Sequence, residues 1–180
     1  MPNGMNQVMK AAVLRVNTAI SDSYGCQWAS EAMRRLATMY DTACIPNSVP
    51  CVVELDVDAP YTLPDGCVRV QRVEDENGIP VKRFTVDARN RIRMPYSGVF
   101  TIEYLSYPPA VSMLVDDPAV NQAYWDALGM YVAMRHLKSV GAEKDYQTQI
   151  EAEFNNTSAD IDARLRNKKR LGFIPVRRWR

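Results

Sequence analysis

Histidine is almost absent from this 180-residue chain, and its four cysteines are scattered. His136 is the single histidine and no two cysteines form a Cys-x-x-Cys pair, so we expect no zinc site built from these residues. The first ten residues, MPNGMNQVMK, lack the apolar centre of a secretion signal. We therefore predict that the cysteines are reduced thiols in a cytoplasmic setting. They are Cys26, Cys44, Cys51 and Cys67.

Long hydrophobic runs are missing as well. No stretch approaches the roughly 18 apolar residues that a membrane span needs, so we expect no membrane partner. No internal repeat or low-complexity segment stands out. The apolar fraction is 47%, which is enough for a packed core in a chain of this length.

Charge is distributed unevenly along the chain. Residues 164–180 hold eight Lys or Arg and no acid. Residues 1–163 therefore hold the other 14 basic residues and all 21 acidic ones, which gives them a net charge of −7. An acidic body with a basic tail indicates an acidic partner surface or nucleic acid as partner.

Apolar residues at helical spacing predict two helices before the middle of the chain. They cover residues 5–20 and 24–43, and their closeness in sequence predicts antiparallel packing. Pro46 and Pro50 are expected to end the second helix, because proline is not tolerated in a helix interior.

Two further helices are predicted after the middle segment. The third begins with Asp117 as its cap and Pro118 in the first helical position, and it runs to about Ser139. The fourth covers residues 143–166. Gly172 and Pro175 argue against a longer helix.

The middle of the chain has the pattern of β-strands. Short runs rich in Val, Ile, Thr, Tyr and Phe alternate with turn signals such as Glu76-Asn77-Gly78. Because the turns are short, we expect antiparallel pairing. The predicted strands lie near residues 51–57, 67–73, 80–87, 90–94 and 98–106.

The predicted fold class is α+β. Residues 1–50 and 110–166 form an antiparallel four-helix bundle, which is interrupted by a small antiparallel β-sheet or sandwich at residues 51–109. Residues 167–180 follow as an extended basic C-terminal arm.

Catalytic signals are weak. His136 has no Ser, Cys or Asp partner in a motif, so we interpret it as a surface or interface residue rather than a general base. Acidic groups occur at residues 74–76, at 116–117 and at 151 and 153. The first lies in a turn and the second at a helix start, where acids are expected, and we favour a structural over a catalytic role for all three. We predict that the protein is not an enzyme and has no catalytic, metal-binding or cofactor-binding residues.

Two groups of residues are candidates for contacts with a partner chain. Arg89, Arg91 and Arg93 alternate, so they share one face, which suits either a partner or a solvated strand edge. Trp125 and Val132 lie beside the main apolar stripe of the third helix, and so wide an arc predicts a central helix or a partner chain.

Tyrosines of the β-segment form a further group. They suit a stacking platform for nucleic acid, but aromatic residues in strands more often simply pack. They are Tyr61, Tyr96, Tyr104 and Tyr107, and we count Tyr96 among the interface candidates.

The C-terminal arm carries the strongest functional signal, because it alternates basic with large apolar residues. A purely electrostatic tail would not need Phe, Ile and Trp, and Arg with Trp is typical of interface anchors. We expect the arm to dock on another subunit, with a disordered tail as the alternative. Its candidate residues are Lys168, Lys169, Arg170, Leu171, Phe173, Ile174, Val176, Arg177, Arg178, Trp179 and Arg180.

The order of elements resembles the head–tail adaptor proteins of tailed bacteriophages, most closely the tail tubular protein A group of short-tailed phages. The resemblance lies in the Tyr61–Asp65 start of the β-insert, the strand from Phe100 to Tyr104, and the Tyr107-Pro108-Pro109 segment after it. The resemblance extends to the acid-rich fourth helix and to the third helix, which contains Tyr124-Trp125, Ala127-Leu128 and Tyr131–Ala133.

The resemblance implies a structural virion protein of the neck. It implies a ring, usually of twelve copies, that joins the portal protein to the tail tube or nozzle protein and lets genomic DNA pass through its lumen without specific binding. The helices would build the ring wall, and the arm would be a portal-binding segment. The protein would be found in the virion, and in the host cytoplasm during assembly, with no cofactor.

Two alternatives stay open. A nucleic-acid-binding protein that acts through the basic arm would bind DNA with steep salt dependence. A tail-associated hydrolase would turn over cell-wall polymer, although nothing in the sequence requires it.

Overall fold

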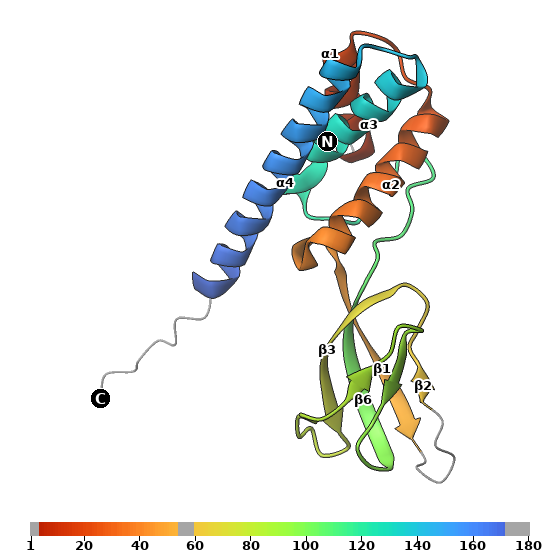
Figure 1. The fold of residues 1–180 in the computed structure, drawn as a ribbon, viewed down its shortest axis with the longest axis vertical. Coiled ribbons are helices and arrows are strands. Elements are labelled where there is room, and N and C mark those ends of the chain that lie inside the picture. The colour runs from red at the N-terminus through yellow and green to blue at the C-terminus, as the bar shows by residue number, and fades with distance from the viewer. Residues whose placement is uncertain (1–3, 54–59, 172–180) are drawn as a thin grey trace, which may run out of the picture. The chain divides into compact units, whose positions relative to one another are not determined.

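The structure is a computed structural model that describes residues 4–53 and 60–171, with the backbone alone for residues 169–171. It is an α+β protein with four helices that pack together and two small three-stranded antiparallel sheets (Figure 1). The chain divides into two compact units. The helical unit contains residues 1–43 and 108–180, and the strand unit contains residues 44–107.

The helical unit is built around α3. Its main helices are α1 (Gly4–Val16), α2 (Asp22–Met39), α3 (Trp125–Ser139) and α4 (Lys144–Leu171), with short 3-10 turns η1 (Asp41–Ala43) and η3 (Gln122–Tyr124). α1, α2 and α4 all pack on α3, and most of its residues are buried. A helix that is apolar on nearly every side is expected at the centre of such a unit.

Gly129 brings α1 and α3 close together. A Cβ atom at this position would lie 2.8 Å from the Cβ of Ala11 and 3.0 Å from the carbonyl oxygen of Val8. The first distance is shorter than carbon atoms tolerate, so the absence of a side chain permits the observed approach of the two helices.

The first two helices are shorter than predicted. α1 ends at Val16 rather than at residue 20, because Asn17 adopts a φ of 50° and its N–H closes the last turn onto the carbonyl of Val13. α2 ends at Met39, four residues early, and the chain continues as η1.

The predicted start of the third helix at Pro118 is wrong, because α3 begins at Trp125. Asp117 does not cap it. The Asn121 side chain instead accepts a hydrogen bond of 3.0 Å from the N–H of Ala123, and so caps η3, which leads directly into α3.

The strand unit contains two sheets. In the first, β1 (Ile45–Val53), β6 (Gly98–Ser106) and β3 (Cys67–Asp75) lie in the order β1-β6-β3. In the second, β2 (Tyr61–Thr62), β5 (Arg91–Arg93) and β4 (Thr85–Val86) lie in the order β2-β5-β4. One apolar cluster contains buried residues from both sheets, among them Val73, Phe100 and Ile102 from the first and Ile92 from the second.

Two strand predictions need correction. β1 begins at Ile45 and includes Pro46 and Pro50, which were expected to end a helix; β1 is an edge strand, where proline is tolerated. The end of the predicted 51–57 strand lies outside the described residues. The predicted 80–87 strand is reduced to Thr85–Val86 and a bridge between Glu74 and Pro80.

Candidate protein-interaction surface

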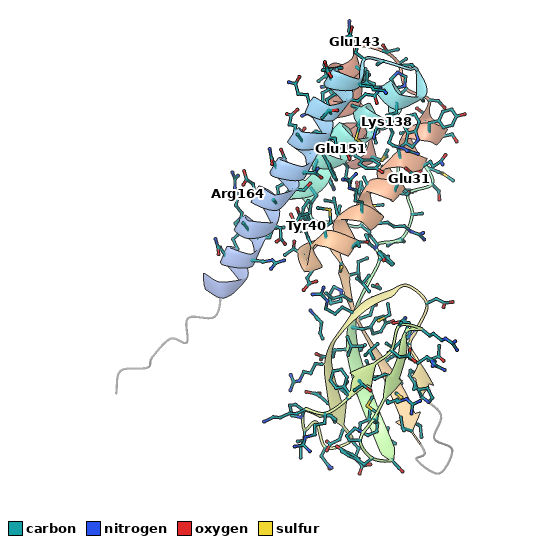
Figure 2. All side chains as sticks on the ribbon, viewed as in Figure 1. Glu31, Tyr40, Lys138, Glu143, Glu151 and Arg164 are labelled. Atoms are coloured by element: carbon teal, nitrogen blue, oxygen red, sulfur yellow. The ribbon has the colours of Figure 1, made fainter. Side chains whose placement is uncertain are left out.

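The end of α4 is the first part of the candidate surface. The last buried position of α4 with a described side chain is Asp162, and the exposed residues Arg164, Arg166 and Lys168 follow. Figure 1 shows the final turns of α4 extending away from the other helices of the unit, and in Figure 2 Arg164 lies on the side of α4 that faces away from them. The helical unit therefore presents a projecting, positively charged helix end.

The predicted boundary between helix and arm is wrong. Lys168, Lys169, Arg170 and Leu171 belong to α4, not to an extended arm. Lys, Arg and Leu are good helix formers, and cations near a helix C-terminus are stabilised by the helix dipole. The other arm candidates lie outside the described residues: Phe173, Ile174, Val176, Arg177, Arg178, Trp179 and Arg180.

A partly buried chain of hydrogen bonds fixes this part of α4 to the helical unit. The Thr42 Oγ1 donates to Oδ1 of Asp162 at 2.7 Å, and it lies 2.6 Å from the Tyr124 hydroxyl. Because Thr42 has one proton to donate, the Tyr124 hydroxyl is the donor in the second bond. Arg166 completes the chain with an ion pair of 2.8 Å from Nε to Oδ2 of Asp162.

Burial keeps the tyrosine hydroxyls around this network protonated. Tyr124 is fully buried, and burial raises the pKa of its phenol to about 12 although the hydrogen bond with Thr42 opposes the shift. Burial also raises the pKa of Tyr40, and the negative charge of Asp162 adds to that effect. Both phenols are therefore neutral at physiological pH.

A second cluster fixes the middle of α4. The Arg35 guanidinium forms an ion pair of 3.2 Å with Glu151 and lies 5.3 Å from the centre of the Phe154 ring. Lys138 approaches the same carboxylate at 3.6 Å, and Figure 2 shows Lys138 and Glu151 near each other. α4 is thus held to α2 and to α3.

Of the two predicted helix-three interface residues, Val132 lies inside the unit and Trp125 is partly exposed. Val132 is fully buried in the helical core, so it is not available to a partner. The Trp125 ring packs against Gly4 and Pro118, where a Cβ on Gly4 would lie 2.5 Å from the ring. The apolar arc is wide because α3 is central, which is the first of the two predicted explanations.

The arginines of the strand unit do not form one free face. Arg89 lies in the turn before β5, and Arg91 is paired with Asp87 at 2.6 Å. The hydrogen bond and charge of Arg91 hold the pKa of Asp87 below its usual range. Arg93 shares a strand face with Arg91. Tyr96 is 43% exposed, and the centre of its ring lies 5.3 Å from the centre of the Phe100 ring.

The remaining candidate residues take part in packing, hydrogen bonds or ion pairs within their own units. His136 packs against Trp28, with ring centres 6.3 Å apart. Asp75 accepts backbone hydrogen bonds in its turn, and Asp116 does so in the segment before η3. Glu151 is paired with Arg35 and Lys138, as described above. Tyr61 packs against the apolar cluster of the strand unit.

The cysteines are free thiols in the structure. Cys26 and Cys51 are buried, and burial raises the pKa of Cys51 to about 11. Within residues 4–53 and 60–171, no group of three or more His, Cys, Asp or Glu side chains is arranged to hold a metal ion. No helix in the described part of the chain is both long and apolar enough to cross a membrane.

Sequence reasoning missed the network of Tyr124, Thr42 and Asp162. Its members come from η3, η1 and α4, and no local pattern links them. The one available signal was the spacing of Asp162 and Arg166, which places the two residues on the same face of a helix.

A scan against models of known protein families finds no match for this chain, and a search of curated proteins finds no significantly similar sequence.

Proposed function

We propose that this protein is a head–tail adaptor of a tailed bacteriophage, a structural subunit that assembles with further copies into a ring, with twelve as the expected number. The ring joins the portal protein to the tail tube or nozzle protein. In this proposal the four helices form an antiparallel bundle in the ring wall, the β-insert contacts neighbouring subunits or tail proteins, and an extended arm anchors the subunit, with the portal as its expected partner.

The observation that supports the proposal best is the projecting end of α4. Asp162 and Glu151 fix the helix to the unit, yet its last turns carry exposed Arg164, Arg166 and Lys168 beyond the core. The 28-residue helix is about 42 Å long and continues for six residues after Leu165, the last described residue that packs against the helical core. A helix that is fixed to its own unit and extends beyond it is suited to contact another subunit.

Exposed apolar side chains favour an assembly protein over an isolated monomer. Leu14 is 73% exposed and Val140 is 61% exposed, and several others lie open in both units. Apolar side chains exposed in this way are available for contact with another subunit. The net charge of −7 over residues 1–163 suits a lumen that repels the DNA backbone. A ring whose lumen is lined by Lys and Arg would contradict that part of the proposal.

The test is assembly on the portal. The full chain is mixed with the portal protein of the same phage, and the products are examined by electron microscopy and native mass spectrometry. We expect a ring of adaptor copies on the portal, and we expect fewer rings when Arg177 and Arg178 are both changed to Asp. A chain that never associates with the portal would overturn the proposal.

Nucleic-acid binding is a second candidate, because Arg164 and Lys168 are exposed on a projecting helix end. It predicts that the chain shifts duplex DNA at low salt, with an affinity that falls steeply as salt rises. The same arm variant would then lose DNA binding. DNA binding without any portal association would favour this candidate over the adaptor.

A further inference from the structure

A groove of about 460 Å³ lies at the start of α2 in the helical unit. One wall is the first turn of α2, including Asp22 and Cys26, and the other is the segment at residues 111–114. The second wall is held in place by Asp116, whose Oδ2 accepts hydrogen bonds of 2.9 Å from the N–H groups of Ser112 and Met113. Both walls are therefore parts of the ordered unit.

The groove has a mixed lining, in which Val111, Met113 and Leu114 lie beside polar side chains, and large side chains in or next to the lining segments are exposed. Met113 is 63% exposed and Val115 is 70% exposed. Tyr24 is 58% exposed and stacks on Trp28 at 5.4 Å between ring centres. Surface aromatic and apolar groups gathered at one place indicate a contact site for another protein segment.

Negatively charged carboxylates lie in or next to the lining of the groove. Hydrogen bonds from Met113 and Ser112 hold the pKa of Asp116 below its usual range, so its carboxylate is ionised at neutral pH. Burial raises the pKa of the Cys26 thiol, and the charges of Asp22 and Asp116 raise it further, so their field reaches the groove. Among the described residues that line the groove, none is Lys or Arg.

We propose that this groove binds residues 172–180 of a second copy of the chain. That segment combines large apolar residues with positive charge, which complements the apolar side chains of the groove, the Asp22 carboxylate in its lining and the Asp116 carboxylate behind one wall. Its apolar residues are Phe173, Ile174, Val176 and Trp179, and its basic residues are Arg177, Arg178 and Arg180.

The segment that fills the groove cannot come from the same copy of the chain, because the groove and the end of α4 lie at opposite ends of the helical unit. The contacts Arg35–Glu151 and Thr42–Asp162 show that α2 and α4 run in the same direction. Figure 1 accordingly shows the first turn of α2 and the last turns of α4 at opposite ends of the helical unit.

The distance from Leu171 to the groove exceeds the reach of the nine residues that follow Leu171. Asp22 precedes Arg35 by about 20 Å of helix and Leu171 follows Glu151 by about 30 Å, at about 1.5 Å per residue. The α2 wall of the groove therefore lies roughly 40 to 50 Å from Leu171. Nine residues reach about 30 Å when fully extended. The segment that follows Leu171 cannot fill its own groove but can fill the groove of a neighbour.

Such a contact joins two different surfaces, so it is head-to-tail, and contacts of this type close into rings when the rotation permits. The inference rests on the proposed function for its setting and deepens it, since it adds a neighbouring copy of the chain to the portal as a partner of the arm.

Photo-crosslinking between labelled copies tests the contact. Phe173 is replaced by p-benzoylphenylalanine in the full chain, and isotopically light and heavy copies are mixed in equal amounts before illumination. We expect crosslinked peptides that join light to heavy chains at residues 22–27 or 111–114. Crosslinks confined to one isotope, crosslinks that consistently join other surfaces, or a chain that forms none would overturn the proposal.

Charge exchange provides a second test with a matched control. We expect Asp22→Lys to weaken self-association roughly three- to tenfold in sedimentation velocity, and Arg177→Asp with Arg178→Asp to restore it in that background. Asp145→Lys is the control, because Asp145 is also an exposed acid in the first turn of a helix. Equal effects of the two Lys variants, or no restoration, would contradict the contact.

Portal assembly, scored on the same samples, separates the two proposals. Light–heavy crosslinks in a chain that ignores the portal would support the groove contact and overturn the adaptor function. Rings on the portal that form equally well with Asp22→Lys, in a chain without groove crosslinks, would do the reverse.

Discussion

Thr42 donates a 2.7 Å hydrogen bond to Asp162, and this single contact joins the 3-10 turn after α2 to the last buried position of α4 whose side chain is described. The same hydroxyl accepts from Tyr124, so one small side chain satisfies two buried polar groups. The projecting end of α4 follows after Leu165, which still packs against the helical core. Its direction therefore depends on a residue far away in the sequence.

Removal of the Thr42 hydroxyl is expected to destabilise the helical unit. Thr42→Val leaves the Tyr124 hydroxyl and one oxygen of Asp162 without their buried partner, which costs about 1–3 kcal/mol. Urea unfolding followed by circular dichroism measures the loss. Thr148→Val is the matched control, since that exposed threonine bonds only to a carbonyl of its own helix. Equal stability of the two variants would contradict the role of Thr42.

The phenol of Tyr124 predicts a loss of stability at high pH. Its pKa is about 12 in the folded protein against a usual value of 10, so the unfolded chain ionises first. The stabilisation is fully present below about pH 10 and is lost as pH rises toward about 12, at a cost of about 2–3 kcal/mol. Tyr124→Phe should be less stable at neutral pH and should show a smaller alkaline decrease. Parallel pH profiles of unfolding free energy for the two proteins would contradict this.

Two glycines should respond differently to alanine. At Gly129 the new Cβ meets the Ala11 Cβ and the Val8 carbonyl, which cannot move without separating α1 from α3. We expect Gly129→Ala to cost about 1–3 kcal/mol even though alanine favours helix. At Gly25 the nearest atoms belong to the flexible end of Met9, so Gly25→Ala should cost less. Thermal unfolding of both variants gives the comparison, and a larger loss at Gly25 would be inconsistent with it.

Arg35 should stabilise the middle of α4. It pairs with Glu151 and lies over the rings of Phe154 and Tyr131, so Arg35→Ala removes a charge contact and packing together. We expect a loss of about 1–2 kcal/mol for the partly buried group. Arg35→Lys should recover only part of it, because an ammonium does not match the planar contact. Full recovery with Lys would contradict the stacking explanation.

The α+β class was predictable, because helical and strand periodicities separate clearly along the sequence. The strand at 98–106 was predicted with its observed bounds, since its β-branched and aromatic residues occupy a central position in the sheet. Helix boundaries were less predictable. Pro118 is a typical helix start, but the chain from 118 to 121 is not helical, and Asn121 caps the 3-10 turn that precedes α3.

The candidate surface was predictable only in part. The basic composition near the C-terminus is a property of the sequence, but the continuation of α4 to Leu171 reflects helix-forming residues placed before Gly172. Val132 was misjudged because a wide apolar arc is equally consistent with a partner chain and with burial by three helices. The groove could not be predicted, because its walls come from segments about 85 residues apart in the sequence.

Native mass spectrometry of the full chain, alone and mixed with the portal protein of the same phage, tests the central claim most directly. The adaptor account predicts a closed complex of defined copy number on the portal, with twelve adaptor subunits as the expected count. A chain that remains unassociated with the portal, whatever it does with DNA, would contradict the account.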